Sequence, residues 1–253
     1  TANMVLLPEM QQAVASAAGK RRRGRLVKGM NALVRGTDWL WHHAVELDTD
    51  YTQWLKATST SLDAEGRRTH VHVASVYVPG KDRSGSRAAR DRVWQHIALT
   101  CERLRKAFAT DTDVNAIVIG GDFNGRLAMN GDAIANDAGA EIRDCAEGNG
   151  LAIVNAMPHA RGTLSFATEK GSSTIDFALI DAEHEPAAVD FEICARSGIG
   201  SDHKPIVLDL AFACTAGGGA PRTACRAPHP ARPNRQLMRA DNHELCDTMD
   251  DEC

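Results

Sequence analysis

A chain of 253 residues, 43% of them apolar, is long enough for one large domain with a substantial core. Its formal net charge of −4 excludes the overall basic field typical of many nucleic-acid binders. An anionic partner would therefore have to be held by local basic patches. The sequence also lacks the run of about 18 apolar residues that a membrane-spanning helix needs.

Seven cysteines are scattered along the chain, without a Cys-x-x-Cys pair or a metal-ligand spacing to histidine. This pattern indicates a reducing compartment and thiols that are mostly buried or unreactive. We therefore expect an intracellular protein. The chain starts at Thr1 and runs directly into a strand-like stretch, which suggests that further sequence precedes it.

The first 80 residues contain mainly strand-like runs. Residues 3–10 form a short apolar run that ends in an acidic residue, interpreted as a buried strand. An Ala-rich, helix-compatible stretch and a basic cluster follow at residues 11–19 and 20–28. Three β-branched runs separated by polar turns predict a strand meander: residues 30–36, 42–48 and 69–80.

Helices and strands then alternate. Residues 86–109 carry apolar side chains at a helical spacing: Val93, Ile97, Leu104 and Phe108. A second helix is predicted at residues 138–150, with a Gly at its end. Four further strands are predicted: residues 115–124, 151–158, 173–181 and 204–212. Because strands outnumber helices and helices fall between strands, we predict an α/β layered fold with mixed sheets.

The composition changes after residue 213. The following segment is rich in Gly, Pro and Ala and has almost no apolar periodicity. Such a segment cannot bury enough surface to offset its ordering entropy. We therefore predict one domain at residues 1–213 and a flexible linker or tail at residues 214–253.

Polar residues stand at the ends of the apolar runs. A carboxylate is costly there unless it is paired or binds a cation. Each residue alone would fit a turn, a helix cap or a solvated strand end. Their joint occurrence predicts one shared site. The residues are Glu9, Asp122, Asn124, Asp176, Asp202 and His203.

Five motifs in this order resemble those of the endonuclease/exonuclease/phosphatase superfamily of metal-dependent phosphodiesterases: "VLLPEM", "VASVYVP", "GGDFNG", "STIDFALI" and "GSDHKPIVLDL". The resemblance covers residues 3 to about 212. Residues 147–176 are particularly similar to the endonuclease domain of non-LTR retrotransposon polyproteins. The resemblance implies a layered α/β-sandwich of two packed, mixed β-sheets flanked by helices. In this family an Asn stands on a strand before the Glu strand, which this sequence does not contain, so the chain is expected to be a fragment or a degraded copy that lacks its first strands.

The resemblance implies roles at the metal and the attacking water. Glu9 would be a metal ligand, although the family usually has Gln where Pro8 stands. Asp202 would complete the metal and His environment. Asp122 and Asn124 would position or activate the water and hold the phosphate. The implied cofactor is Mg²⁺ or Mn²⁺.

The resemblance also implies contacts to the substrate. Tyr77 would touch the phosphate, and Asp176 would orient His203. Thr163 corresponds to the family's phosphate-side hydroxyl, with Ser165 as a close rival.

Elementary chemistry agrees with these roles. A phosphodiester repels hydroxide, so an enzyme must neutralise the phosphate and supply a positioned base. A hard cation prefers oxygen ligands, which favours carboxylates over cysteines. A carboxylate-bound His203 can stabilise phosphate charge as imidazolium, or it can act as base while Asp122 orients water. The sequence leaves both assignments open. The two glycines before Asp122 are expected to let the turn approach the phosphate.

The leading functional hypothesis is a DNA-nicking endonuclease of a non-LTR retroelement. Its partners would be DNA and a downstream reverse transcriptase, with no membrane, and its location would be the nucleus. Basic patches at residues 20–28 and 81–92 favour DNA, although they equally fit solvated loops. The alternatives are a phosphatase of the same superfamily acting on a small molecule or lipid, and a non-catalytic retroelement remnant.

Overall fold

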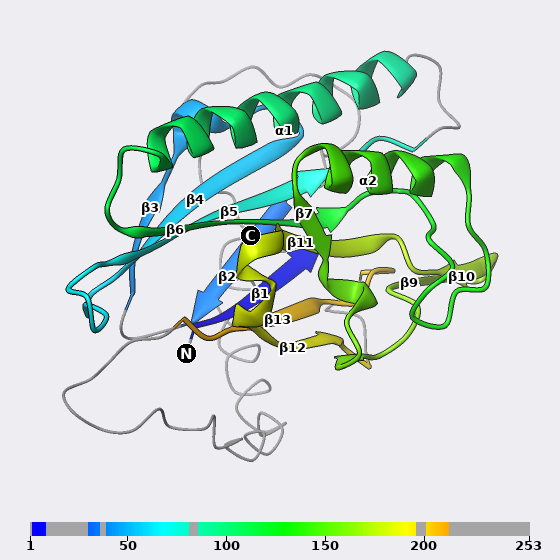
Figure 1. Ribbon diagram of the computed structural model, residues 1–253. Helices are drawn as coiled ribbons and strands as arrows, with labels where there is room; N and C mark the ends of the chain where they lie inside the picture. The colour runs from blue at the N-terminus through cyan, green and yellow to red at the C-terminus, as the bar shows by residue number, and fades with distance from the viewer. Residues whose placement is uncertain (1, 9–29, 36–38, 81–85, 196–200, 213–253) are drawn as a thin grey trace, which may run out of the picture. The chain divides into compact units, whose positions relative to one another are not determined.

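The computed structural model describes residues 2–8, 30–35, 39–80, 86–195 and 201–212 (Figure 1). The chain divides into two units, residues 1–216 and 217–253, and every described residue belongs to the first. The predicted tail, the predicted helical stretch 11–19 and the basic cluster 20–28 lie outside the described residues. None of the described helices is long and apolar enough to cross a bilayer.

A six-stranded mixed sheet, the central sheet, has the strand order β3-β4-β5-β6-β11-β7. β5 and β6 run parallel, and all other neighbours are antiparallel. Both faces of β5 and β6 are largely buried, which explains why they read as continuous apolar runs. The strands are β3 (Trp39–His43), β4 (Thr52–Ser59), β5 (Thr69–Tyr77), β6 (Val114–Asp122), β7 (Leu151–Ile153) and β11 (Asp176–Asp181).

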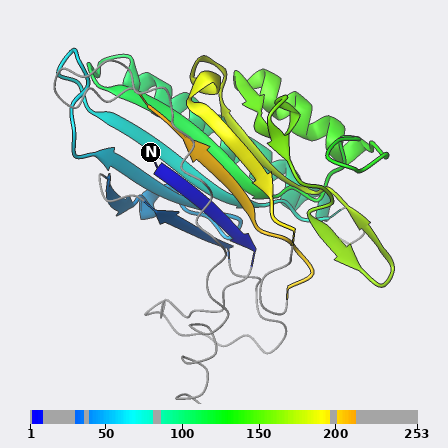
Figure 2. The same cartoon turned by 90° about the horizontal axis from the view of Figure 1, so that it is seen from below.

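A second, five-stranded sheet has the order β2-β1-β13-β12-β8 and is also mixed, because only β12 and β8 run parallel. Figure 2 shows its strands stacked on one face of the central sheet. Val118 and Ile180 of the central sheet pack in one buried cluster with Phe191 and Leu208 of the second. The strands are β1 (Ala2–Pro8), β2 (Met30–Arg35), β8 (Ala160–Arg161), β12 (Ala188–Ile193) and β13 (Ile206–Leu210). A separate hairpin, β9 (Phe166–Thr168) and β10 (Gly171–Ser173), projects beside the sheets (Figure 2).

Two helices cover the other face of the central sheet (Figure 1). α1 (Ser86–Phe108) buries Val93 and Ile97 against it, as the helical spacing predicts. α2 (Asp137–Gly148) begins at Asn136, whose side chain accepts a hydrogen bond from the Gly139 amide. Three short 3₁₀ helices complete the described elements: η1 (Val45–Leu47), η2 (Val154–Ala156) and η3 (Ala182–Ala187).

The structure confirms the predicted α/β layered fold with two packed, mixed sheets and flanking helices. Three details of the prediction are wrong. The run 151–158 is a strand only as far as Ile153, because η2 follows it. The run 42–48 is not one strand, because β3 ends at His43 and η1 follows. The predicted single meander is divided, because β2 pairs with β1 in the second sheet, whereas β3, β4 and β5 are neighbours in the central one. Apolar alternation marks a strand but does not select its partner.

Candidate active site

Three predicted site residues lie in one row across the central sheet. Tyr77 on β5 is the register partner of Asp122 on β6, and Asp122 is the register partner of Asp176 on β11. The row stands where β5 and β6 end and β11 begins. Strand pairing thus brings together side chains that are far apart in the sequence.

His203 lies between the two carboxylates of this row. Its Nδ1 is 3.0 Å from Oδ2 of Asp176, and its Nε2 is 3.8 Å from Oδ2 of Asp122. His203 and Asp176 are each only 3% exposed. An isolated antiparallel β-bridge joins the backbones of Phe166 and His203. The Phe166 ring packs edge-on against the imidazole, with 4.9 Å between the ring centroids. This geometry holds the imidazole in one orientation.

Asn124 holds the carboxylate of Asp122. Its backbone N–H donates to Oδ1 of Asp122 at 2.9 Å, and its Nδ2 donates to Oδ2 at 3.1 Å. The same Nδ2 donates to the carbonyl of Val78 at 2.8 Å. The φ of Asn124 is 49°, a left-handed conformation that Asn tolerates better than most residues. The spacing of Asp122 and Asn124 therefore builds a turn that orients the carboxylate.

Ser165 holds the other carboxylate. Its hydroxyl donates to Oδ2 of Asp176 at 2.6 Å and accepts the backbone N–H groups of Ile175 and Asp176. Ser165 is fully buried, so its hydroxyl is an internal support and not a group exposed to a phosphate. Asn155, which the sequence analysis did not single out, braces β11 by donating to the Asp176 carbonyl and accepting from the Ala178 N–H. The sequence signal for Asn155 was a polar residue at the end of the apolar run "LAIVN".

The two residues predicted to contact phosphate differ in exposure. Tyr77 is half-buried, and its ring stacks on Tyr51 at 6.5 Å. Thr163 is exposed, and its carbonyl accepts a hydrogen bond from Nζ of Lys204 at 2.9 Å. Thr163 lies two residues before Ser165, whose hydroxyl binds Asp176.

Of the two predicted metal ligands, Glu9 lies outside the described residues. Asp202 is half-buried, and its carboxylate makes no hydrogen bond or ion pair with any other residue that the structure describes. A carboxylate oxygen without a partner fits a hard divalent cation.

Two other groups of metal-capable side chains lie elsewhere in the described parts of the chain. In the first, His70 already bonds Asp113 at 3.1 Å, with Asp111 beside them. In the second, Asp181 already accepts hydrogen bonds from Arg105 and from the Ile117 N–H. The second group also contains Glu183 and His184.

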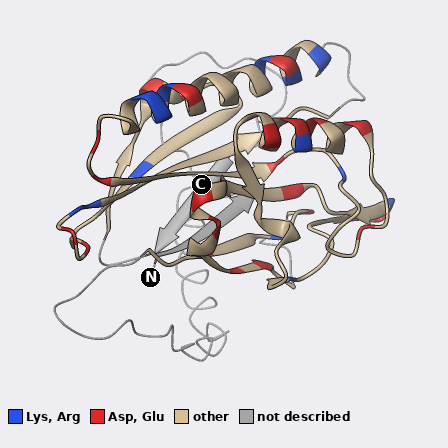
Figure 3. Ribbon diagram, in the orientation of Figure 1, with Lys and Arg blue, Asp and Glu red and all other residues tan. Residues whose placement is uncertain are grey.

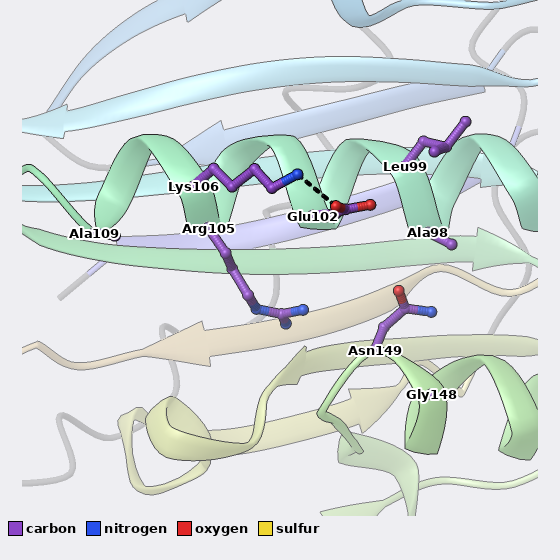
Figure 4. A pocket seen from close by; sticks show the side chains of 8 residues that line it. All are labelled: Ala98, Leu99, Glu102, Arg105, Lys106, Ala109, Gly148 and Asn149. Carbon is purple, nitrogen blue, oxygen red and sulfur yellow. Dashed lines mark hydrogen bonds and ion pairs between the residues drawn. The ribbon is translucent and has the colours of Figure 1, made fainter.

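A groove of about 560 Å³ lies between α1 and the end of α2 (Figure 4). It is separate from the Asp122–His203 site. Arg105, which lines it, bonds Asp181 at the far end of β11. Asp181 stands five positions after Asp176 along β11, a distance of about 17 Å.

Gly121, the second of the two glycines before Asp122, lies inside β6 with φ of 147°, and a Cβ added there would stand 2.0 Å from the Val76 carbonyl oxygen. The absent side chain thus lets β5 and β6 approach closely. The expected approach of this turn to a phosphate stays a prediction.

Part of the predicted basic patch at residues 81–92 is also not available to DNA. Arg90 is 2% exposed and is ion-paired with Glu141, and it donates to the Pro79 carbonyl. Burial of an arginine requires this pairing. Arg87 and Arg92 are exposed, and residues 81–85 lie outside the described part.

A sandwich of two mixed sheets that brings Asp, Asn, Asp and His to one sheet edge defines the endonuclease/exonuclease/phosphatase superfamily, whose members are hydrolases. Residues 71–207, more than half of the chain, match the family model described as endonuclease-reverse transcriptase, and the chain belongs to this family. The resemblance seen in the sequence is thereby confirmed.

One solved structure shares the fold, and two others are similar to a lesser degree. The endonuclease domain of TRAS1, a telomere-specific non-LTR retrotransposon, is 15% identical with a TM-score of 0.52, over 72% of this chain and 74% of that one. The catalytic domain of Xenopus laevis APE2 is 15% identical over 65% and 57% of the two chains, with a TM-score of 0.49. The 3′ phosphatase NExo from Neisseria, bound to a product DNA hairpin, is 15% identical over 73% and 77%, with a TM-score of 0.46. A comparison with curated proteins finds no match.

Proposed function

We propose that the protein is a metal-dependent phosphodiesterase that nicks DNA as the endonuclease of a non-LTR retroelement. The observation that carries the proposal is the imidazole of His203 held between Asp176 and Asp122. Two carboxylates beside one imidazole favour its protonated form. In that form Nε2 donates a hydrogen bond to a phosphoryl oxygen and stabilises the charge that develops there.

This geometry supports Asp122 as the group that accepts the proton of the attacking water. Its carboxylate is 3.8 Å from Nε2 of His203, and Asn124 fixes its orientation. His203 then acts as the charge-stabilising group, and Asp176 fixes the orientation of the ring by accepting from Nδ1–H.

We propose that Asn124 positions the attacking water. Its Nδ2 already donates to Val78 and Asp122, which uses both amide hydrogens and leaves Oδ1 as the remaining side-chain acceptor. We therefore assign Asn124 to holding the water and Asp122. The substrate phosphate contacts belong to Tyr77 and Thr163.

The metal would be Mg²⁺ or Mn²⁺, held by Asp202 and Glu9. The Asp202 carboxylate, which has no partner among the residues that the structure describes, supports this assignment. When bound, the ion would neutralise charge on the phosphoryl oxygen.

The substrate would be DNA in the nucleus, and a reverse transcriptase would follow in the full-length polyprotein. The charged side chains of α2 are mainly acidic (Figure 3). We therefore place the DNA away from this helix. The exposed Arg87 and Arg92 on α1 remain as basic contacts from the second predicted patch.

The test compares nicking of supercoiled plasmid by the wild type and His203→Ala, with Mg²⁺ and with EDTA. We expect the wild type to nick the plasmid with Mg²⁺ but not with EDTA. His203→Ala should not nick it under either condition. Asp144→Asn, an exposed change on α2, is the control and should nick normally. A parallel assay with soluble phosphomonoesters separates the two enzyme classes: phosphate release without nicking would make the protein a phosphatase. A folded wild type inactive in both assays would support the non-catalytic alternative.

A further inference from the structure

Lys204 directly follows His203 and carries a charge that the described residues do not neutralise. Its Nζ donates to the carbonyl of Thr163 at 2.9 Å. No described carboxylate forms an ion pair with it. A carbonyl accepts one of the three N–H donors of an ammonium group but supplies no counter-charge.

Arginines in the same part of the structure are neutralised. Arg126 forms a two-point pair with Asp132, at 2.7 and 2.5 Å. Arg161 pairs with Asp190 at 2.5 Å and with Glu192 at 3.3 Å. Lys204 therefore differs from these two arginines, and it directly follows His203.

The backbone fixes the place of Lys204. Its N–H donates to the Ser165 carbonyl at 2.6 Å, and the Ala167 N–H donates to the Asp202 carbonyl at 2.9 Å. These bonds join the segment that carries His203 to the segment that carries Ser165. Consecutive Cα atoms are about 3.8 Å apart, so the Lys204 side chain starts directly beside the residue that carries the imidazole.

We propose that Lys204 binds a DNA backbone phosphate adjacent to the one that is cleaved. The inference rests on the proposed function, since it requires a polyanionic substrate at His203. A nucleic acid bound there presents further phosphates on both sides of the reacting one, and an ammonium group binds such a phosphate as a point charge. The contact provides affinity, and the reacting phosphate remains with His203.

The experiment measures binding of the full chain to a fluorescent DNA duplex by anisotropy at several KCl concentrations. Lys204→Met removes the charge and the donor, Lys204→Gln removes the charge and keeps a donor, and Lys204→Arg keeps both. We expect Met and Gln to weaken binding and to reduce the slope of log affinity against log salt by about 1, with Arg close to wild type. In nicking assays the same two variants should raise KM with little change in kcat.

Lys106→Met is the matched control, because Lys106 lies on α1 at the far groove and pairs with Glu102. It should leave the salt slope unchanged. A Gln variant with wild-type slope beside a weakened Met variant would assign Lys204 to holding Thr163, and an unchanged slope in both would exclude the phosphate contact. Either result overturns the inference. The proposed function is then still supported if the wild type nicks plasmid. A wild type that neither binds nor nicks DNA would overturn both.

Discussion

Asp122 and Asp176 are register partners on adjacent antiparallel strands, and one imidazole contacts both of their side chains. Neither carboxylate depends on His203 alone for its orientation. Asn124 holds the first and Ser165 holds the second. Supports of this kind keep catalytic groups in place before substrate arrives.

Replacement of Asp122 by Asn should abolish most activity and lower stability by about 1 kcal/mol, because one of the two oxygens that accept from Asn124 becomes a donor. The amide keeps the shape of the side chain but cannot accept a proton from water. Loss of such a group typically lowers the rate about 10² to 10³-fold. Plasmid nicking and thermal melting measure the two effects. Activity at the wild-type rate would show that Asp122 is not the base.

Replacement of Ser165 by Ala should affect both stability and catalysis. It leaves the N–H groups of Ile175 and Asp176 without their acceptor in a buried place, which costs about 1–3 kcal/mol in unfolding free energy. It also removes the donor to Asp176, so the pH profile of nicking should shift. Thr168→Ala, at an exposed position, should change neither. An unshifted pH profile would limit Ser165 to a structural role.

Replacement of Gly121 by Ala should prevent normal folding. The new Cβ would stand 2.0 Å from the Val76 carbonyl oxygen, and φ of 147° is unfavourable for any other residue. Gly148 provides the control, since a Cβ there meets nothing within 4 Å. As the last residue of α2 it should tolerate Ala, with a gain of up to about 1 kcal/mol. Equal urea midpoints for the two variants would contradict the close approach of β5 and β6.

His72 should make the protein less stable in mild acid. Burial lowers the pKa of His72 to about 4, and the charges of Lys56 and His70 add to this effect. The unfolded chain binds a proton near pH 6.5, so this stability is complete above pH 6.5 and is lost as the pH falls towards 4. The full loss is about 3 kcal/mol at most.

Urea unfolding between pH 7.5 and 4.5 measures this contribution. His72→Leu should flatten the pH dependence, because the unfolded chain then gains no proton at this position. His159→Gln, at an exposed histidine, should retain the wild-type curve. If the wild type and His72→Leu have the same slope, the imidazole is protonated in the folded protein.

The long, periodic elements could be predicted from the sequence, because their pattern is local. The apolar spacing of α1 and the continuous apolar runs of β6 and β11 reflect burial of one face or of both. The polar residues that end these runs were predicted for the same reason, since each is an exception to the pattern around it. The sequence alone therefore determined the class of fold and predicted which residues share one site.

Only the tertiary structure decided how these parts meet. The pairing of β2 with β1, the burial of Arg90 against Glu141 and the close approach at Gly121 all join segments that are distant in sequence. Ser165 and Thr163 look alike as hydroxyls two residues apart, yet one is buried on Asp176 and the other is exposed. A local pattern shows that a side chain is buried or polar, whereas strand register and packing select the atoms it contacts.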